Sequence, residues 1–189
     1  MGGRLIIVGG HSRHVGKTSL VVALLRTLHA PEWTAVKISS HQHGTASEWV
    51  EENPAESRYL QAGAGRAFLV CAPDATFERA VQPIRRLLAE GRNVIVESNR
   101  FAAYCAADLT LFVIAPCIAD WKPSSTYPLG KADAIVLSGE GELPPVAEAL
   151  AGERIRGLPR FRLGVAPLEL SPEWVHFCRR AAGGGIAFL

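Results

Sequence analysis

The sequence is poor in the residues that cross-link a protein or anchor it in a membrane. Its 189 residues include only four cysteines. Cys71, Cys105, Cys117 and Cys178 are widely spaced without a Cys-x-x-Cys pair, which argues against a zinc knuckle and a dithiol redox pair. No apolar run is long enough to span a bilayer, and the chain enters an apolar stretch at Leu5 without a signal peptide. We therefore expect a cytoplasmic protein with reduced thiols and no membrane partner.

An excess of charge of one sign is also missing. The 20 basic and 18 acidic residues leave a net charge of +2, too little for the basic surface that nucleic-acid binding needs. No nucleic-acid partner is therefore expected. Apolar residues make up 48% of the chain and charged residues 20%, the profile of an ordinary globular protein. At this length one hydrophobic core is the default, so we expect a single domain over residues 1–189.

What the sequence does contain is an alternation of short apolar runs with segments of helical periodicity. This alternation predicts an α/β fold, in which βα units wind around a mostly parallel sheet of about six to seven strands with helices on both faces. The runs predicted as strands are residues 5–8, 34–38, 67–71, 93–97, 109–114 and 134–137.

Capping and periodicity signals predict four helices. One begins at Thr18, a second is announced by Asn53 and a following proline, and a third begins near Phe77 and is kinked or delayed by Pro83. A last helix is announced by Ser171 and the proline that follows it. The polar segments 41–52 and 116–131 are predicted as long loops, which in compact domains are usually functional or mobile.

The first predicted strand runs into the segment Gly10-His-Ser-Arg-His-Val-Gly-Lys-Thr18, which opens an apolar helix. A Gly-Lys-Thr between a strand and a helix is typical of a P-loop, whose backbone N–H groups and helix N-terminus bind phosphate. The three-layer P-loop NTPase fold follows from this context. The residues predicted to contact the nucleotide here are Gly10, His11, Ser12, Arg13, His14, Val15, Gly16, Lys17, Thr18 and Ser19.

Three of these residues have specific predicted roles. Gly16 lets the backbone approach the phosphates, Lys17 supplies a compact positive charge for the β- and γ-phosphates, and the Thr18 hydroxyl ligates Mg²⁺. Five residues separate Gly10 from Gly16, one more than the usual spacing. The longer loop is similar to that of dethiobiotin synthetase, which belongs to the same P-loop class as the signal-recognition, MinD and nickel-insertion GTPases.

Glu97 ends a predicted buried strand and is the expected acidic partner of the metal. It would hold Mg²⁺ or orient the attacking group, with a solvated strand-end glutamate as the alternative. Ser98 and Asn99 follow at the carboxyl edge of the sheet, where open α/β sheets bind ligands, and Asn99 is predicted to contact the nucleotide.

Lys37 lies near the end of the second predicted strand in an apolar run, so its charge needs a partner or access to water. We expect a phosphate or substrate contact with a catalytic role, and ion pairing with Glu97 is the alternative. His41 and His43 follow that strand, and His11 and His14 lie in the phosphate loop. These histidines are predicted to touch phosphate or substrate, with a metal site or no role as the alternatives.

Taken together, the motifs resemble those of MobB, the GTP-binding protein family of molybdopterin-guanine dinucleotide biosynthesis. The resemblance rests on the P-loop with its apolar helix, on the strand that carries Lys37 and the histidines behind it, and on the segment 56–64 leading into residues 68–70. It covers roughly residues 4–115. Ser98 stands where the family has a glycine after its Val-Glu pair.

The resemblance implies binding and slow hydrolysis of GTP with Mg²⁺. Gly16, Lys17, Thr18 and Glu97 would carry over to the nucleotide and the metal. It also implies a partner protein of molybdenum-cofactor biosynthesis and a homodimer. GTP is inferred from the family alone, because no Asn/Thr-Lys-x-Asp string follows the last predicted strand.

Two other functions remain open from the sequence. The glycine spacing favours an ATP-dependent ligase or kinase of the dethiobiotin synthetase type, in which Lys37 would grip a carboxylate or carbamate. A nucleotide-dependent switch with little turnover would need no second substrate pocket.

Overall fold

The described residues of the computed structural model, 2–28, 32–39, 47–55, 57–164 and 171–181, form one sheet of eight strands in the order β3-β4-β2-β5-β1-β6-β7-β8. All neighbouring strands are parallel except β3, which runs antiparallel to β4 at one edge. The strands are β1 Leu5–Gly10, β2 Trp33–Ser39, β3 Glu48–Glu51, β4 Arg66–Cys71, β5 Asn93–Glu97, β6 Leu109–Ile114, β7 Ala134–Ser138 and β8 Arg160–Leu163.

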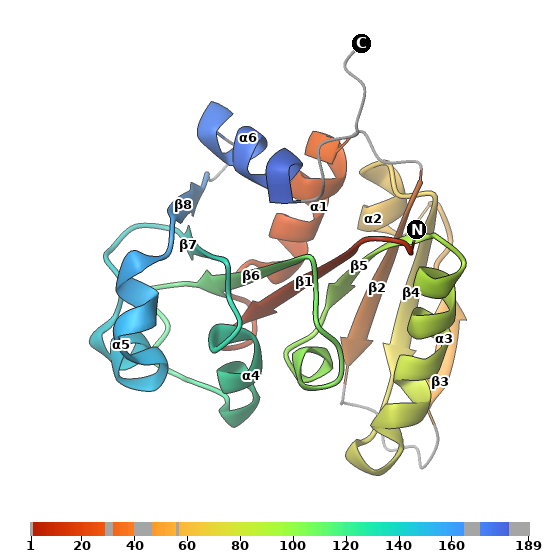
Figure 1. The fold of residues 1–189 in the computed structure, drawn as a ribbon, viewed down its shortest axis with the longest axis horizontal. Coiled ribbons are helices and arrows are strands. Elements are labelled where there is room, and N and C mark those ends of the chain that lie inside the picture. Colours follow the sequence, from red (N-terminus) through yellow and green to blue (C-terminus); the bar gives the residue numbers. More distant parts are fainter. Residues whose placement is uncertain (1, 29–31, 40–46, 56, 165–170, 182–189) are drawn as a thin grey trace.

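Helices cover both faces of the sheet (Figure 1), because the buried strands are apolar on both sides. Alternate residues of β1 illustrate the division: Ile6 and Val8 pack in the core with α1, whereas Leu5 and Ile7 pack in the core with α3. The α-helices are α1 Lys17–Leu28, α2 Arg58–Gln61, α3 Phe77–Ala89, α4 Thr126–Leu129, α5 Pro145–Ala151 and α6 Pro172–Ala181. Short 3₁₀ helices are η1 Asp74–Thr76, η2 Arg100–Ala103, η3 Pro123–Ser125 and η4 Gly152–Gly157.

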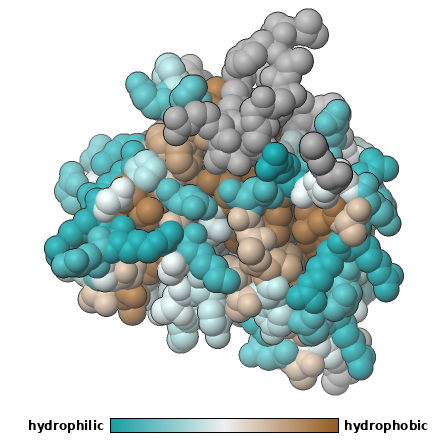
Figure 2. Space-filling model, in the orientation of Figure 1, coloured by the Kyte–Doolittle hydropathy of each residue, from teal (hydrophilic) through white to brown (hydrophobic). Residues whose placement is uncertain are grey.

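The helices divide into two layers. α1, α2 and α6 share one core, while α3 and η2 pack on the opposite face near β2, β4 and β5, and α4 and α5 pack on that face near β6 and β7. Hydrophilic side chains gather over the outer surfaces of α3 and α5 (Figure 2), as expected for helices that bury one stripe. The predicted three-layer α/β architecture is therefore confirmed.

All six predicted strands are present, and two more lie at the sheet edges. β3 forms within the segment predicted as a loop from 41 to 52, and β8 pairs with β7. Both have only four residues and are largely exposed, so they lack the apolar runs that reveal the central strands. The segment 116–131 is not a plain loop either, since it contains η3 and α4.

The second helix starts later than predicted. Asn53 accepts a hydrogen bond from the Ala55 amide in a turn, and Ser57 instead caps α2 by accepting from the Leu60 amide. Both are good capping residues. The helix starts after Ser57 because its hydroxyl accepts the hydrogen bond from the first turn. α2 ends before Gly63, as predicted, whereas α3 begins at Phe77 and continues through Pro83 without delay.

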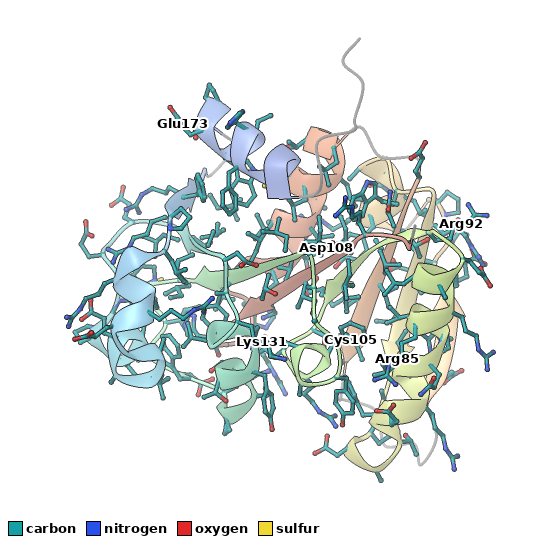
Figure 3. All side chains as sticks on the ribbon, viewed as in Figure 1. Arg85, Arg92, Cys105, Asp108, Lys131 and Glu173 are labelled. Carbon is teal, nitrogen blue, oxygen red and sulfur yellow. The ribbon has the colours of Figure 1, made fainter. Side chains whose placement is uncertain are left out.

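Polar contacts outside the core fix the ends of several elements. Asp108 accepts hydrogen bonds from the Leu5 amide and the Arg4 guanidinium, which fixes the start of β1. Lys131, which follows α4, donates to the Ala102 carbonyl of η2 at 2.6 Å (Figure 3). Within the described residues, no helix is long and apolar enough to cross a membrane.

Candidate functional site

A cavity of about 580 Å³ lies at the carboxyl edge of the sheet, beyond the ends of β1, β2 and β5. This is where open parallel sheets bind ligands. Its lining joins segments that are far apart in sequence, namely Arg13, His14, Gly16, Lys17, Thr18, Ser19, Lys37, Ile38, Ser39, Arg58, Phe77, Glu97, Ser98, Asn99, Arg100, Lys122 and Ser124. Seven of these side chains are basic or histidine and one, Glu97, is acidic, so the cavity suits a polyanion.

The phosphate loop forms one side of this cavity. It leaves β1 at Gly10, where a Cβ atom would lie 2.7 Å from the Val15 side chain. It enters α1 after Gly16, which has φ +99° and where a Cβ would lie 2.9 Å from the Ser138 hydroxyl oxygen. Both glycines are therefore required by the backbone path.

The phosphate loop contains an unusual backbone conformation at His14. His14 has φ +58°, and it is the one non-glycine residue with positive φ in the described part of the chain. Left-handed backbone is uncommon outside glycine and marks a constrained turn. The side chain of His14 lines the cavity, as predicted for a ligand contact.

The start of α1 presents its amide groups to the cavity. The Leu20 amide donates to the Gly16 carbonyl at 2.9 Å, so the amides before it have no acceptor within the helix. These amides and the positive end of the helix dipole favour an anion. Thr18 and Ser19 lie in this first turn and line the cavity.

Lys17 is the first residue of α1, and its ammonium donates to the Ser12 carbonyl at 2.5 Å. The pKa of Lys17 is lowered to about 8, mainly by burial; the charge of Glu97 opposes this shift, and the positive charges of Lys122 and Lys37 add to it. A cation with a lowered pKa that is folded back onto its own loop is poised to gain an anionic partner.

Glu97 is buried, with 6% of its surface exposed, so the alternative of a solvated strand-end glutamate is excluded. Its Oε2 atom accepts a hydrogen bond of 2.8 Å from the Thr18 hydroxyl and a short one from the Tyr59 hydroxyl. Burial, followed by the Glu97 charge, raises the pKa of Tyr59, which therefore stays neutral and able to donate.

The sequence left two kinds of partner open for Lys37, a phosphate or substrate group and the Glu97 carboxylate. Sheet register pairs it with Glu97 on the neighbouring strand, and its Nζ lies 3.6 Å from Glu97 Oε1 and 3.2 Å from Thr18 Oγ1. The ion pair with Glu97, the alternative expected from the sequence, is therefore present. The side chain of Lys37 is 41% exposed and lines the cavity, so it can also reach a ligand.

Four of the predicted contact residues belong to the loop but do not line the cavity, namely Gly10, His11, Ser12 and Val15. His11 is fully buried, its Nε2 pairs with the Ile118 carbonyl, and its ring lies 4.7 Å from that of Trp121. Burial lowers the pKa of His11, which favours the neutral ring. The Ser12 hydroxyl donates to Asp120 at 2.7 Å. The side chains of His11 and Ser12 therefore shape the loop. Only the backbone of these residues is left to contact the nucleotide.

The Asn99 carboxamide is engaged with the loop as well. It accepts from the Gly10 amide at 2.9 Å and donates to the Gly10 carbonyl at 2.8 Å, so it clamps the end of β1. Asn99 also lines the cavity, and its contact with a nucleotide stays a prediction. His41 and His43 lie outside the described residues, in which no group of three or more His, Cys, Asp or Glu side chains could hold a metal ion.

Sequence reasoning missed several residues of the site. Tyr59 lies in the segment on which the family resemblance rests, but no role followed from it. Arg58, Arg100 and Lys122 carry charge in turns and short helices, where no periodicity marks a functional position. Arg100, three residues after Glu97, was the easiest of them to find.

Comparison with known proteins shows the fold. No protein-family model and no curated protein matches the sequence. Among solved structures, HypB from Helicobacter pylori in complex with nickel has a TM-score of 0.53 at 14% identity, over 99% of this chain and 92% of HypB. LpxK from Aquifex aeolicus in complex with ATP has a TM-score of 0.52 at 19% identity, over 86% of this chain and 54% of LpxK. The chain thus spans about half the length of LpxK and shares the three-layer fold of both proteins.

Proposed function

We propose that this protein binds a nucleoside triphosphate together with Mg²⁺ in the cavity, with the triphosphate held by residues 10–19. The observation that carries the proposal is Lys17, whose partly buried ammonium stands at the start of a helix and, among the described residues, hydrogen-bonds only the carbonyl of Ser12. A triphosphate would give this cation the anionic partner that it lacks and would meet the amides of the first turn of α1.

The residues present fit a magnesium ion. The Thr18 hydroxyl and the Glu97 carboxylate are oxygen donors in direct contact, and Mg²⁺ prefers oxygen ligands and takes the rest of its shell from phosphates and water. A bound Mg²⁺ would neutralise charge that develops on the phosphates. Tyr59 holds Glu97 in place, and Thr18 would exchange its hydrogen bond to Glu97 for a contact with the metal.

Lys37 would change partners when the ligand binds. In the free protein its ammonium neutralises Glu97. Once Mg²⁺ neutralises Glu97, the attraction between Lys37 and that carboxylate weakens. The ammonium can then turn to the γ-phosphate or to a second substrate.

Within this function we favour a GTP-binding protein of the MobB type that hydrolyses GTP slowly, acts with a partner of molybdenum-cofactor biosynthesis and forms a homodimer. Support comes from the order of its motifs in the sequence. Tyr59, within the segment 56–64 that carries the resemblance, contacts the proposed metal-binding carboxylate.

The second candidate is an ATP-dependent kinase or ligase. Two observations favour it, the longer phosphate loop with its turn at His14 and a cavity that carries more cations than a triphosphate needs. LpxK, which is similar in fold, was solved in complex with ATP. A nucleotide-dependent switch with little turnover is the third reading.

Competition binding between non-hydrolysable GTP and ATP analogues, with Mg²⁺ present, tests the choice of nucleotide. The MobB-type function requires clearly tighter binding of the GTP analogue. Tighter binding of the ATP analogue would favour the kinase or ligase. If small-molecule acceptors do not raise turnover, the nucleotide-dependent switch is the remaining candidate.

A further inference from the structure

The cavity also has cations that do not belong to the phosphate loop. Lys37 lies at the end of β2, Arg58 begins α2 and Arg100 begins η2. We propose that the wall formed by Ser39, Arg58, Phe77 and Arg100 binds a small anionic second substrate through a carboxylate or phosphate group. This proposal rests on the function proposed above and adds the chemical class of the substrate.

The position of the wall separates it from the phosphate loop. The phosphate loop continues β1, and the wall surrounds the end of β2, with β5 between the two strands. Neighbouring strands lie about 4.8 Å apart, so the ends of β1 and β2 are separated by about 10 Å. An anion at the wall would therefore occupy a place of its own, with Glu97 and Lys37 between it and the loop.

The two arginines reach the end of β2 from opposite faces of the sheet. Arg58 belongs to α2, whose Tyr59 packs in the core shared with α1, whereas Arg100 follows β5 and packs on Phe77 in the core of α3. Ser39 at the end of β2 also lines the cavity. Two guanidinium groups on the lining of one cavity offer a clamp for a flat or tetrahedral oxyanion.

Arg100 is held ready for such a ligand. Its guanidinium lies 4.0 Å from the centre of the Phe77 ring, which is buried and fixes the plane of the guanidinium. Its Nη1 pairs with Asp74, whose side chain is 86% exposed. Such exposed pairs contribute little stability, so a ligand carboxylate or phosphate can displace Asp74.

Arg58 is the second arginine of the clamp, and it is less constrained than Arg100. It is exposed, and no described residue accepts a hydrogen bond from its guanidinium. It is also the direct neighbour of Tyr59, whose hydroxyl contacts Glu97.

Isothermal titration of inorganic phosphate, and separately of succinate, tests this wall. The first sample is wild-type protein saturated with Mg²⁺ and a non-hydrolysable triphosphate, so that the phosphate loop is filled. We expect one further anion to bind. Arg58→Gln should weaken that binding by about tenfold or more, since it removes a charged hydrogen-bond donor. Arg79→Gln, an exposed arginine of α3 outside the cavity, is the matched control and should bind as wild type.

Lys17→Ala separates the two proposals. If wild-type protein binds no triphosphate, the proposed function fails. The Lys17→Ala protein, whose phosphate loop is impaired, still measures phosphate binding at the wall. Arg100→Lys, which keeps the charge but loses the fork, should give intermediate affinity. Binding of one anion that depends on Arg58 supports the wall. Absence of binding by both anions, or unchanged binding in Arg58→Gln, would overturn it.

Discussion

Thr18 donates a hydrogen bond of 2.8 Å to Glu97, and this contact joins the first turn of α1 to the carboxyl end of β5. The two residues are 79 positions apart in the sequence. Their contact exists because β1 and β5 are neighbours in the sheet, with Val8 opposite Glu97. The proposed metal ligands are therefore brought together by the parallel pairing of two strands.

Glu97→Gln should lower magnesium-dependent turnover by roughly 10–100-fold, the range seen when partners of a metal site are changed. Glutamine keeps the shape of the side chain but removes the charge that Lys37 and the metal require. Binding of the nucleotide without Mg²⁺ should be preserved, because residues 10–19 are unchanged. Steady-state turnover over a range of Mg²⁺ concentrations measures the effect. Full activity would remove Glu97 from the mechanism.

Tyr59→Phe tests how far the tyrosine positions Glu97. The ring stays buried, but the carboxylate loses the Tyr59 hydroxyl as a hydrogen-bond donor. We expect the free energy of unfolding to fall by about 1–3 kcal/mol, measured by urea denaturation. Turnover should fall while the dissociation constant of the nucleotide without Mg²⁺ stays the same. If stability falls and turnover does not, Tyr59 is only part of the core.

Lys17 predicts a pH dependence of nucleotide binding. Its pKa in the free protein is about 8 because of burial, and an anionic ligand raises it again. The complex therefore holds more protons than the free protein above about pH 8, so binding takes up protons and the affinity falls as pH rises. Calorimetry at pH 8.5 in buffers with different ionisation enthalpies measures the uptake. Identical heats in all buffers would contradict this account.

The same pKa fixes the sign of a stability effect. An unfolded lysine titrates near pH 10.4, so between about pH 8 and pH 10.4 the unfolded chain holds more protons than the folded one. The contribution of Lys17 to stability therefore rises with pH across this window. Lys17→Ala should remove that rise in urea denaturation of the free protein.

Asn99→Ala should destabilise the loop from behind. It removes both hydrogen bonds that clamp Gly10, and we expect a loss of about 1–3 kcal/mol in the free energy of unfolding. Hydrogen exchange should quicken at the Gly10 amide, which loses its acceptor. Asn99→Asp, which keeps the acceptor and loses the donor, is the matched control and should retain the protection of that amide. Unchanged exchange in Asn99→Ala would show that the clamp is dispensable.

The central sheet was predictable because its strands are buried on both faces. A run such as residues 109–114 is apolar except for Thr110, and every residue of β6 is buried. β3 and β8 were not predictable, since short exposed edge strands carry no such run. The start of α2 was misplaced because Asn53 and Ser57 are both good caps, and the choice depends on packing of Tyr59 against the sheet.

The sequence predicted those residues of the candidate site that combine a charged side chain with a place near the end of a strand. Glu97 and Lys37 each lie near the end of a strand, and their pairing follows from the register of β2 with β5. Tyr59 reaches Glu97 through tertiary packing, so its role was not visible in the sequence. The same holds for His11, whose loop position suggested a ligand contact and whose ring is instead buried against Trp121.

Isothermal titration calorimetry of a nucleoside triphosphate with Mg²⁺ into wild-type and Lys17→Ala protein tests the central claim most directly. Wild-type protein should bind one triphosphate, and Lys17→Ala should lose the binding while its circular dichroism spectrum stays that of the folded protein. Lys131→Ala, which removes a lysine that contacts the Ala102 carbonyl outside the cavity, should bind as wild type. No heat with any triphosphate, or unchanged affinity in Lys17→Ala, would contradict phosphate binding at this loop.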